Sequence, residues 1–172
     1  MIILKYAGIV ILAVMLAVAL YTDLRWCRIY NKLTLPCILI GLILNTLYLG
    51  THGFLLSIGG IGLIFLLYVT LAPAAGIGGG DVKLMMAVGS LMGAGFLINA
   101  LLLTAIIGGI MSLIVMMKHR ILGSTTKRMA TNLYMKLILR APADMATGTS
   151  GVKFRYSLAI TLGCILAFFI KF

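Results

Sequence analysis

The sequence carries very little negative charge. Its 172 residues include three aspartates, Asp23, Asp81 and Asp144, and no glutamate. Charged residues of both signs make up 10% of the chain, and hydrophobic residues make up 63%. Soluble globular domains average about 45–50% apolar and about 25% charged residues. The composition therefore excludes an ordinary soluble domain and predicts a polytopic membrane protein.

Cysteine and histidine are also scarce. The three cysteines, Cys27, Cys37 and Cys164, are scattered and form no Cys-x-x-Cys motif. The two histidines, His52 and His119, are predicted on opposite faces of the membrane. A zinc site needs about four clustered ligands, so this pattern disfavours one. We expect neither a metal nor a cofactor.

Long apolar runs predict six transmembrane helices. In chain order these are Ile2–Leu20, Leu33–Leu49, Phe54–Leu71, Leu84 to about Gly93, Leu97–Met117 and Tyr156–Ile170. About 20 apolar residues cross the hydrocarbon as a helix, so the first run is long enough to span rather than to serve as a signal peptide. The predicted fold is an all-α bundle of six helices in a single membrane-embedded domain, residues 1–172.

Three short segments are predicted to separate these spans. The run Leu84–Met117 would measure about 51 Å as one helix, against hydrocarbon about 30 Å thick. Two spans joined near Gly93-Ala94-Gly95 fit better. Elsewhere, Gly50-Thr51-His52-Gly53 is predicted to form a turn, and Pro73 is predicted to end the third helix before a glycine-rich loop.

The positive charges predict the orientation. Loops 21–34, 72–83 and 118–155 hold 12 of the 14 Lys and Arg residues, which places them in the cytoplasm and the N-terminus outside. The net charge of +11 is then explained by this bias and by attraction to anionic lipid, and requires no nucleic-acid partner. Within the last loop, residues 132–139 are predicted to form a surface helix, and Asp144 is predicted to be solvated.

Two of the aspartates are expected at the same membrane face. Asp23 follows the first span and Asp81 precedes the fourth, with two complete spans between them. Two carboxylates within hydrogen-bonding distance do not both ionise readily, so one keeps a proton near neutral pH. Such a pair can activate a water and protonate a leaving amine, as in aspartic proteases. The alternative is two interfacial helix caps neutralised by Arg25 and Lys83.

Two short stretches carry a family resemblance. Gly78-Gly79-Gly80-Asp81 matches the Gly-x-Gly-Asp motif of intramembrane aspartyl proteases, and its extension through Lys83 resembles the type IV prepilin peptidase family. The stretch 23–31 is similar to that family's other signature, an Asp and Arg followed by Arg-Ile-x-Asn, although Tyr30 stands where many relatives have proline. Residues 154–163 also lack the proline that many relatives have before the last span.

The resemblance implies a role for each candidate residue. Asp23 and Asp81 would form the catalytic dyad, and Gly78 and Gly80 would allow the backbone to approach Asp81 closely. Apart from the resemblance, Lys83 is expected to be an interfacial anchor rather than a catalytic group. The remaining candidates, which would hold Asp23 or dock the substrate, are Arg25, Arg28 and Asn31. Positive-inside placement accounts equally well for Arg25 and Arg28.

The resemblance also implies a substrate, a precursor pilin or pseudopilin with a short basic leader and an apolar helix. The enzyme would cut before that helix at the cytoplasmic face of the inner membrane. The first cytoplasmic loop is short and lacks Cys-x-x-Cys, which is typical of peptidase-only enzymes of tight-adherence (Flp) pilus systems; archaeal preflagellin peptidases are also similar.

Two alternatives from other functional classes stay open. The first is a proton-coupled transporter in which the aspartates form a relay, although relay carboxylates usually lie near the bilayer midplane. The second is a non-enzymatic subunit of a pilus or secretion assembly. In that case Asp-to-Asn changes would leave function intact.

Overall fold

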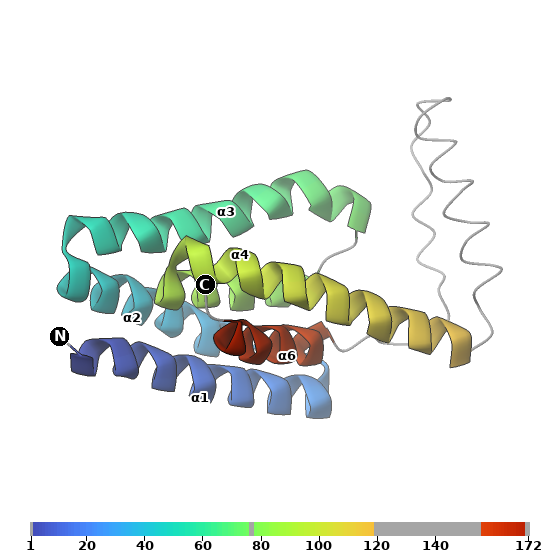
Figure 1. Ribbon diagram of the computed structural model, residues 1–172. Coiled ribbons are helices and arrows are strands. Elements are labelled where there is room, and N and C mark those ends of the chain that lie inside the picture. The colour runs from blue at the N-terminus through green and yellow to red at the C-terminus, as the bar shows by residue number, and fades with distance from the viewer. Residues whose placement is uncertain (1, 76–77, 119–155, 171–172) are drawn as a thin grey trace. The chain divides into compact units, whose positions relative to one another are not determined.

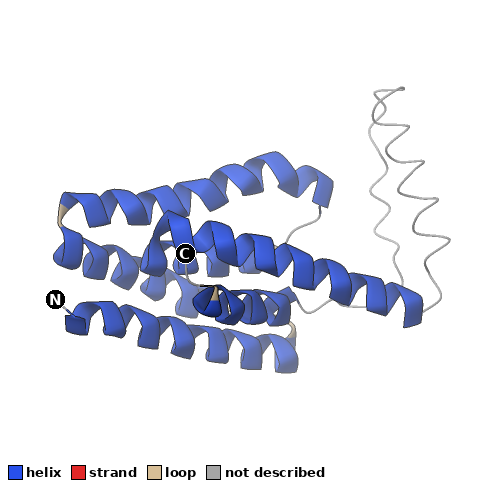
Figure 2. Cartoon of the chain, in the orientation of Figure 1, coloured by secondary structure: helices blue, strands red, loops and turns tan. Residues whose placement is uncertain are grey.

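A computed structural model describes residues 2–75, 78–118 and 156–170. Within these ranges the chain forms helices and no strand, which confirms the predicted all-α class (Figures 1 and 2). The helices are α1 (Ile2–Trp26), α2 (Asn31–Leu49), α3 (Thr51–Ala75), α4 (Gly79–Lys118) and α6 (Tyr156–Phe169). The predicted surface helix at 132–139, together with His119 and Asp144, lies outside the described residues.

Several of these helices are long and apolar enough to cross a membrane. The four candidate spans among the described residues are Tyr6–Trp26, Asn31–Leu49, Thr51–Thr70 and Gly79–Val115. The last helix, α6, is also apolar but has only 14 residues. The part of the chain that the structure describes is thus all-helical, with several membrane-spanning candidates.

The helices begin and end at different residues from those predicted. Helix α1 continues past Leu20 to Trp26, so Asp23 lies in its last turn rather than in a loop. Helix α3 continues through Pro73 to Ala75, and the prediction that this proline ends the helix was wrong. A backbone in the bilayer must satisfy its own polar groups, which favours continued helix beyond the apolar run.

The predicted four-residue turn after α2 was also wrong. Gly50 alone separates α2 from α3, and it has a φ of 62°. Glycine adopts this positive-φ conformation at little cost, so one residue suffices to reverse the chain.

Helix α4 is broken at Gly93, as the length of its apolar run predicted. Gly93 has φ 79° and ψ 172°, which no α-helix accommodates. A methyl group on Gly89 would lie 2.8 Å from Cδ2 of Leu97, although residues eight apart in a straight helix are about 12 Å apart. The chain therefore doubles back here (Figure 1). We call residues 79–92 the N-terminal arm and residues 94–118 the C-terminal arm.

The N-terminal arm packs against its neighbours with almost no space between the backbones. A methyl group on Gly60 of α3 would lie 2.5 Å from the carbonyl oxygen of Gly89. A methyl group on Gly41 of α2 would lie 2.8 Å from the amide nitrogen of Leu91. Small residues at helix contacts are the usual means of close packing in membranes, where dispersion replaces the hydrophobic effect.

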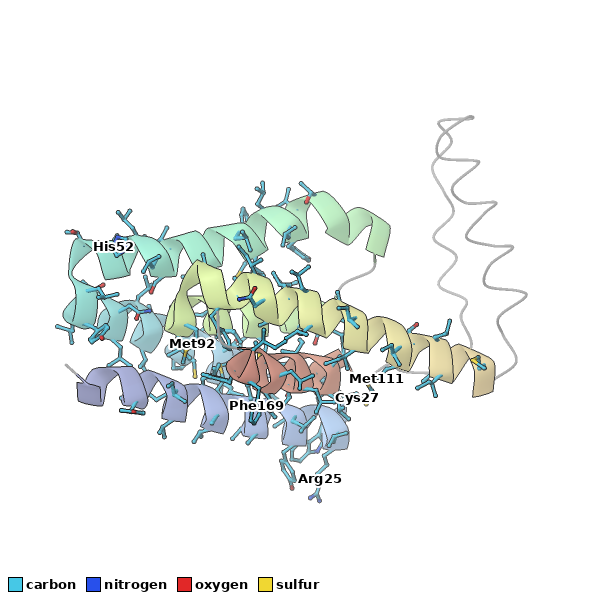
Figure 3. The ribbon with its side chains drawn as sticks, in the orientation of Figure 1. Arg25, Cys27, His52, Met92, Met111 and Phe169 are labelled. Atoms are coloured by element: carbon cyan, nitrogen blue, oxygen red, sulfur yellow. The ribbon has the colours of Figure 1, made fainter. Side chains whose placement is uncertain are left out.

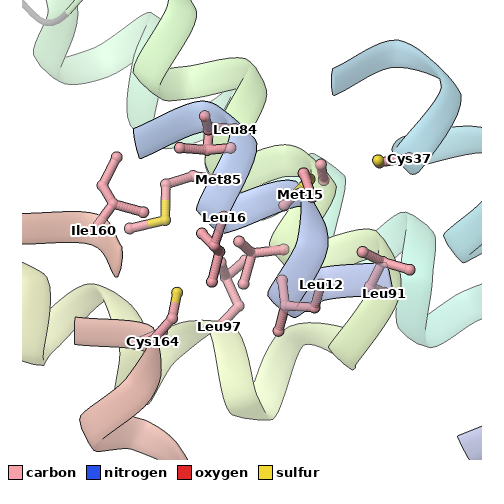
Figure 4. Packing of buried hydrophobic residues seen from close by; sticks show 14 of the residues in the cluster. Leu12, Met15, Leu16, Cys37, Leu84, Met85, Leu91, Leu97, Ile160 and Cys164 are labelled. Carbon is pink, nitrogen blue, oxygen red and sulfur yellow. The ribbon is translucent and has the colours of Figure 1, made fainter. Parts of the chain in front are cut away.

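The buried core joins this arm to α1, to the C-terminal arm and to α6 (Figure 4). Helix α1 packs against α2 and α6, and α6 approaches the C-terminal arm so closely that a methyl group on Gly163 would overlap the Thr104 hydroxyl. The largest fully buried apolar side chains are Leu12, Met15, Leu84, Val88, Leu97 and Ile160.

A polar cluster seals the break in α4. The reversal at Gly93 removes the helical partners of the Ser90 and Leu91 carbonyl groups. The Asn45 side-chain amide of α2 donates to both carbonyls, at 2.8 and 3.2 Å. The Ser57 hydroxyl of α3 also donates to the Ser90 carbonyl, at 2.8 Å. Side chains of two helices, α2 and α3, thus satisfy backbone groups of α4 that would otherwise be unpaired in hydrocarbon.

Replacing Asn45 by alanine is expected to destabilise the bundle. The Leu91 carbonyl loses its side-chain donor, and hydrogen bonds of this kind are worth about 1–2 kcal/mol in membrane proteins. Thermal unfolding of the detergent-solubilised protein should show a lowered Tm. Thr46→Ala is the matched control, because the exposed Thr46 hydroxyl bonds only within its own helix, to the Leu42 carbonyl. Equal Tm values for the two variants would contradict the proposed sealing role.

Candidate functional site

Asp23 lies in the last turn of α1, where its side chain is buried. The hydroxyl of Ser157, in the first turn of α6, donates to Oδ2 of Asp23 at 2.5 Å. Ser157 is itself fully buried. The carboxylate is therefore held by a residue from the opposite end of the sequence rather than by its own loop.

The chain leaves α1 by a strained turn. Cys27 has a φ of 51°, and its amide donates to the Asp23 carbonyl at 2.9 Å. Helices often end on such a left-handed residue, but it is usually glycine. Because the turn is tight, only residues 27–30 connect α1 to α2, and Ile29 lies against the start of α4. A methyl group on Gly80 would come 3.1 Å from Cβ of Ile29, so glycine at position 80 lets the two segments meet.

Asp81 is the third residue of α4. The amides of Asp81 and Val82 donate to the carbonyl of Gly78, at 3.0 and 3.3 Å, which starts the helix. The Asp81 carboxylate folds back towards this residue, since a methyl group on Gly78 would lie 3.0 Å from Oδ2. Any side chain at position 78 would press on the Asp81 carboxylate. This contact explains why glycine suits position 78.

The two carboxylates come within electrostatic range of each other, as the topology predicted. Asp23 at the end of α1 acts on Asp81 at the start of α4, and Tyr156 at the start of α6 lies within the same range of Asp81. Ends of three helices thus meet at one site. Its polar side chains come from Asp23, Asp81, Tyr156 and Ser157.

The other predicted site residues separate into two groups. Lys83 and Asn31 are brought together, with Nζ of Lys83 donating to Oδ1 of Asn31 at 2.9 Å. Arg25 is exposed and extends away from the helices (Figure 3). Its guanidinium donates to the Tyr21 hydroxyl at 2.9 Å and lies 5.3 Å from the centre of the Trp26 ring. Arg25 therefore packs along its own helix rather than holding Asp23.

Arg28 is likewise exposed. The structure gives it no contact with either aspartate among the described residues. Its predicted role in holding Asp23 is therefore without support, and docking of substrate stays a prediction.

Comparison with known families decides the class of protein. A family model described as the type IV leader peptidase family matches residues 10–113. The chain belongs to this family. The matched stretch contains Asp23 and Asp81, and α6 lies beyond it. No curated protein and no solved structure gave a significant match. Membership confirms the resemblance seen in the two signatures and implies a peptidase, with precursors that carry a leader as its class of substrate.

Sequence reasoning missed two side chains at the site of this peptidase. Residues 154–163 were noted only for their lack of proline, whereas Tyr156 and Ser157 lie beside the aspartates. A signal was available. The last span was predicted to begin at the same membrane face as Asp23 and Asp81, so polar residues in its first turn were candidates.

The Lys83–Asn31 hydrogen bond is expected to hold the start of α4 against the start of α2. It is exposed, so its loss should cost about 1 kcal/mol, or about a fivefold fall in leader cleavage. Lys83→Met and Asn31→Ala should each lower the cleavage rate by this factor, and the double variant no further. Lys32→Met, which removes a neighbouring exposed charge, is the control. Additive losses in the double variant would show that the two residues act separately.

Proposed function

We propose that Asp23 and Asp81 form the catalytic dyad of an aspartic endopeptidase that removes the leader from type IV prepilins or pseudopilins. The observation that carries the proposal is the convergence of the two carboxylates. They come from the ends of two helices and interact, in a chain that belongs to the type IV leader peptidase family. No other acidic side chain lies in the described part of the chain.

The pair can perform both proton transfers of peptide hydrolysis. The ionised carboxylate removes a proton from a water, and the water oxygen attacks the scissile carbonyl carbon. The protonated carboxyl group donates to the carbonyl oxygen as it becomes negative. When the tetrahedral intermediate breaks down, a proton passes to the leaving amine nitrogen. General acid–base catalysis of this kind typically contributes 10²–10⁴-fold, and its titration belongs to the pair.

The proposed membrane topology has six spans with the N-terminus outside. The two arms of α4 supply two spans joined at Gly93, and α6 supplies the last. Both aspartates then lie at the cytoplasmic face, where the basic leader of a precursor emerges. The apolar helix of the substrate would dock laterally against the bundle. The short first loop supports a peptidase-only enzyme of the Flp type, in the inner membrane.

The transporter alternative receives no support from the position of the aspartates. Asp23 is in the last turn of α1 and Asp81 in the first turn of α4. Relay carboxylates of transporters usually lie near the bilayer midplane on broken helices. The break in α4 is at Gly93, at the opposite end of the N-terminal arm from Asp81.

Asp23→Asn and Asp81→Asn are each expected to abolish cleavage of a co-expressed prepilin-like substrate. Asparagine keeps the shape of the side chain but cannot exchange the proton, so the rate should fall at least about 100-fold. Membrane levels of each variant should equal those of the wild type. Asp144→Asn changes the third carboxylate of the chain and should cleave normally. Substantial cleavage by either dyad variant would refute the two-aspartate mechanism.

The orientation can be tested separately by cysteine labelling. In a variant whose three native cysteines are replaced by serine, His52→Cys is expected to react with a membrane-impermeant maleimide in intact cells. Lys32→Cys should react only after permeabilisation, because positive-inside bias places it in the cytoplasm. The reverse pattern would place the dyad at the outer face and exclude cytoplasmic cleavage.

A further inference from the structure

The two aspartates of the dyad differ in their surroundings. Asp23 is 9% exposed and accepts a hydrogen bond from Ser157, which is 0% exposed. Asp81 is half-buried at the start of α4, and its carboxylate folds over Gly78. A proton shared between two carboxylates rests on the one whose ionised form is less well stabilised. The hydrogen bond from α6 therefore makes the pair unequal.

We propose that Ser157 is a positioning residue that keeps Asp23 as the ionised, water-activating member of the dyad and leaves the proton on Asp81. This inference rests on the proposed function. The Ser157 hydroxyl has one proton, which it donates to Oδ2 of Asp23. Oδ1 is then the oxygen available to a water. Donation to an ionised carboxylate is charge-assisted and about twice as strong as donation to a neutral group, so it favours the anion at Asp23.

Three effects act in the opposite direction. Asp23 is the more deeply buried of the two carboxylates and lies in the last turn of α1, and both burial and that end of the helix dipole disfavour its ionised form. Asp81 is in the first turn of α4, where the helix dipole favours a negative charge. That field is screened near the membrane surface, and it is weaker than a direct hydrogen bond from a buried donor to a charged group. The inference is that the charge-assisted hydrogen bond from Ser157 outweighs these three effects.

The packing of α6 holds the Ser157 hydroxyl in place. Ala159, Ile160 and Cys164 are fully buried, and Gly163 lies against Thr104 with no room for a side chain. Helix α6 thus has little freedom to rotate. Rotation by one residue would turn Ser157 away from Asp23 by about 100°. Ser157 also lies outside the stretch 10–113 that carries the family match, so its role is not part of the two aspartate signatures.

The test is the kinetics of Ser157→Ala on a synthetic prepilin-like peptide, with the purified full chain in detergent. We expect kcat to fall about 10- to 100-fold with KM changed less than about threefold, because the hydroxyl acts on Asp23 and not on substrate binding. The ascending limb of the pH–rate profile should move to higher pH, because the Asp23 anion has lost its donor. The other titratable or charged side chains at the helix ends and the turn that meet here are Asp81, Lys83, Tyr156, Lys32, Cys27, Tyr21, Arg25, Arg28 and Tyr30.

Ser90→Ala is the matched control. Ser90 is equally buried and donates its hydroxyl at 2.7 Å, but to the backbone carbonyl of Ile38, away from the aspartates. It should lower the Tm and leave both kcat and the pH profile unchanged. Ser157→Cys keeps a weaker donor at similar volume and should give an intermediate kcat and an intermediate shift. If the Ser157→Ala variant does not accumulate in the membrane, the Ser157→Cys variant alone is sufficient for the test.

A wild-type pH profile in the Ser157 variants would overturn the inference, whatever the change in rate. This outcome is distinct from failure of the dyad. If Asp23→Asn and Asp81→Asn are inactive while the Ser157 variants behave as wild type, the two-aspartate mechanism is supported and only the proposed role of Ser157 is refuted. If the Asp variants still cleave the substrate, both the two-aspartate mechanism and the proposed role of Ser157 are refuted.

Discussion

The N-terminal arm of α4 reaches the middle of the bundle because its contact surfaces carry almost no side-chain volume. Gly89 meets Gly60 of α3 backbone to backbone, and Gly41 of α2 meets Leu91 in the same way. A side chain at Gly60 or Gly41 would force the helices apart, since even a methyl group there would overlap the facing backbone. Since Asp81 stands at the start of this arm, the same contacts fix where its carboxylate lies relative to α1 and α6. The geometry of the proposed dyad thus depends on glycines that lie at the other end of the arm from Asp81.

The site itself is assembled from helix ends rather than from a loop. Asp23 closes α1, Asp81 opens α4 and Ser157 opens α6, so each side chain is held by a rigid element. The glycines of the signature act sterically. Gly78 leaves room for the Asp81 carboxylate, and Gly80 leaves room for Ile29 from the turn that follows Asp23. The two signatures are therefore parts of one contact.

The features predicted correctly were those that depend on local composition or on length. The apolar runs indicated helices, the 34-residue run required a break near Gly93, and the order of the spans indicated that the two aspartates could meet. Helix ends were predicted poorly, because hydropathy falls at the first polar residues while the backbone stays helical through Asp23 and through Pro73. Ser157 could not be assigned, since its partner is 134 residues away and only packing of α6 brings them together.

The role of Asn45 could be predicted only in part from the sequence. An amide in an apolar run is costly unless it is paired, so a buried partner could be predicted from sequence alone. Which carbonyl groups it serves could not, because these become free only where α4 reverses.

The lengths of the helices bear on the shape of the membrane around the site. The N-terminal arm and α6 each contain 14 residues and measure about 21 Å, whereas hydrocarbon is about 30 Å thick. Helix α1, with 25 residues, is about 37 Å long. Bilayers respond to short helices by thinning beside them. In the proposed six-span topology the hydrophobic mismatch falls on the N-terminal arm, which carries Asp81 at its first turn, and local thinning would bring lipid headgroups and water towards the proposed dyad.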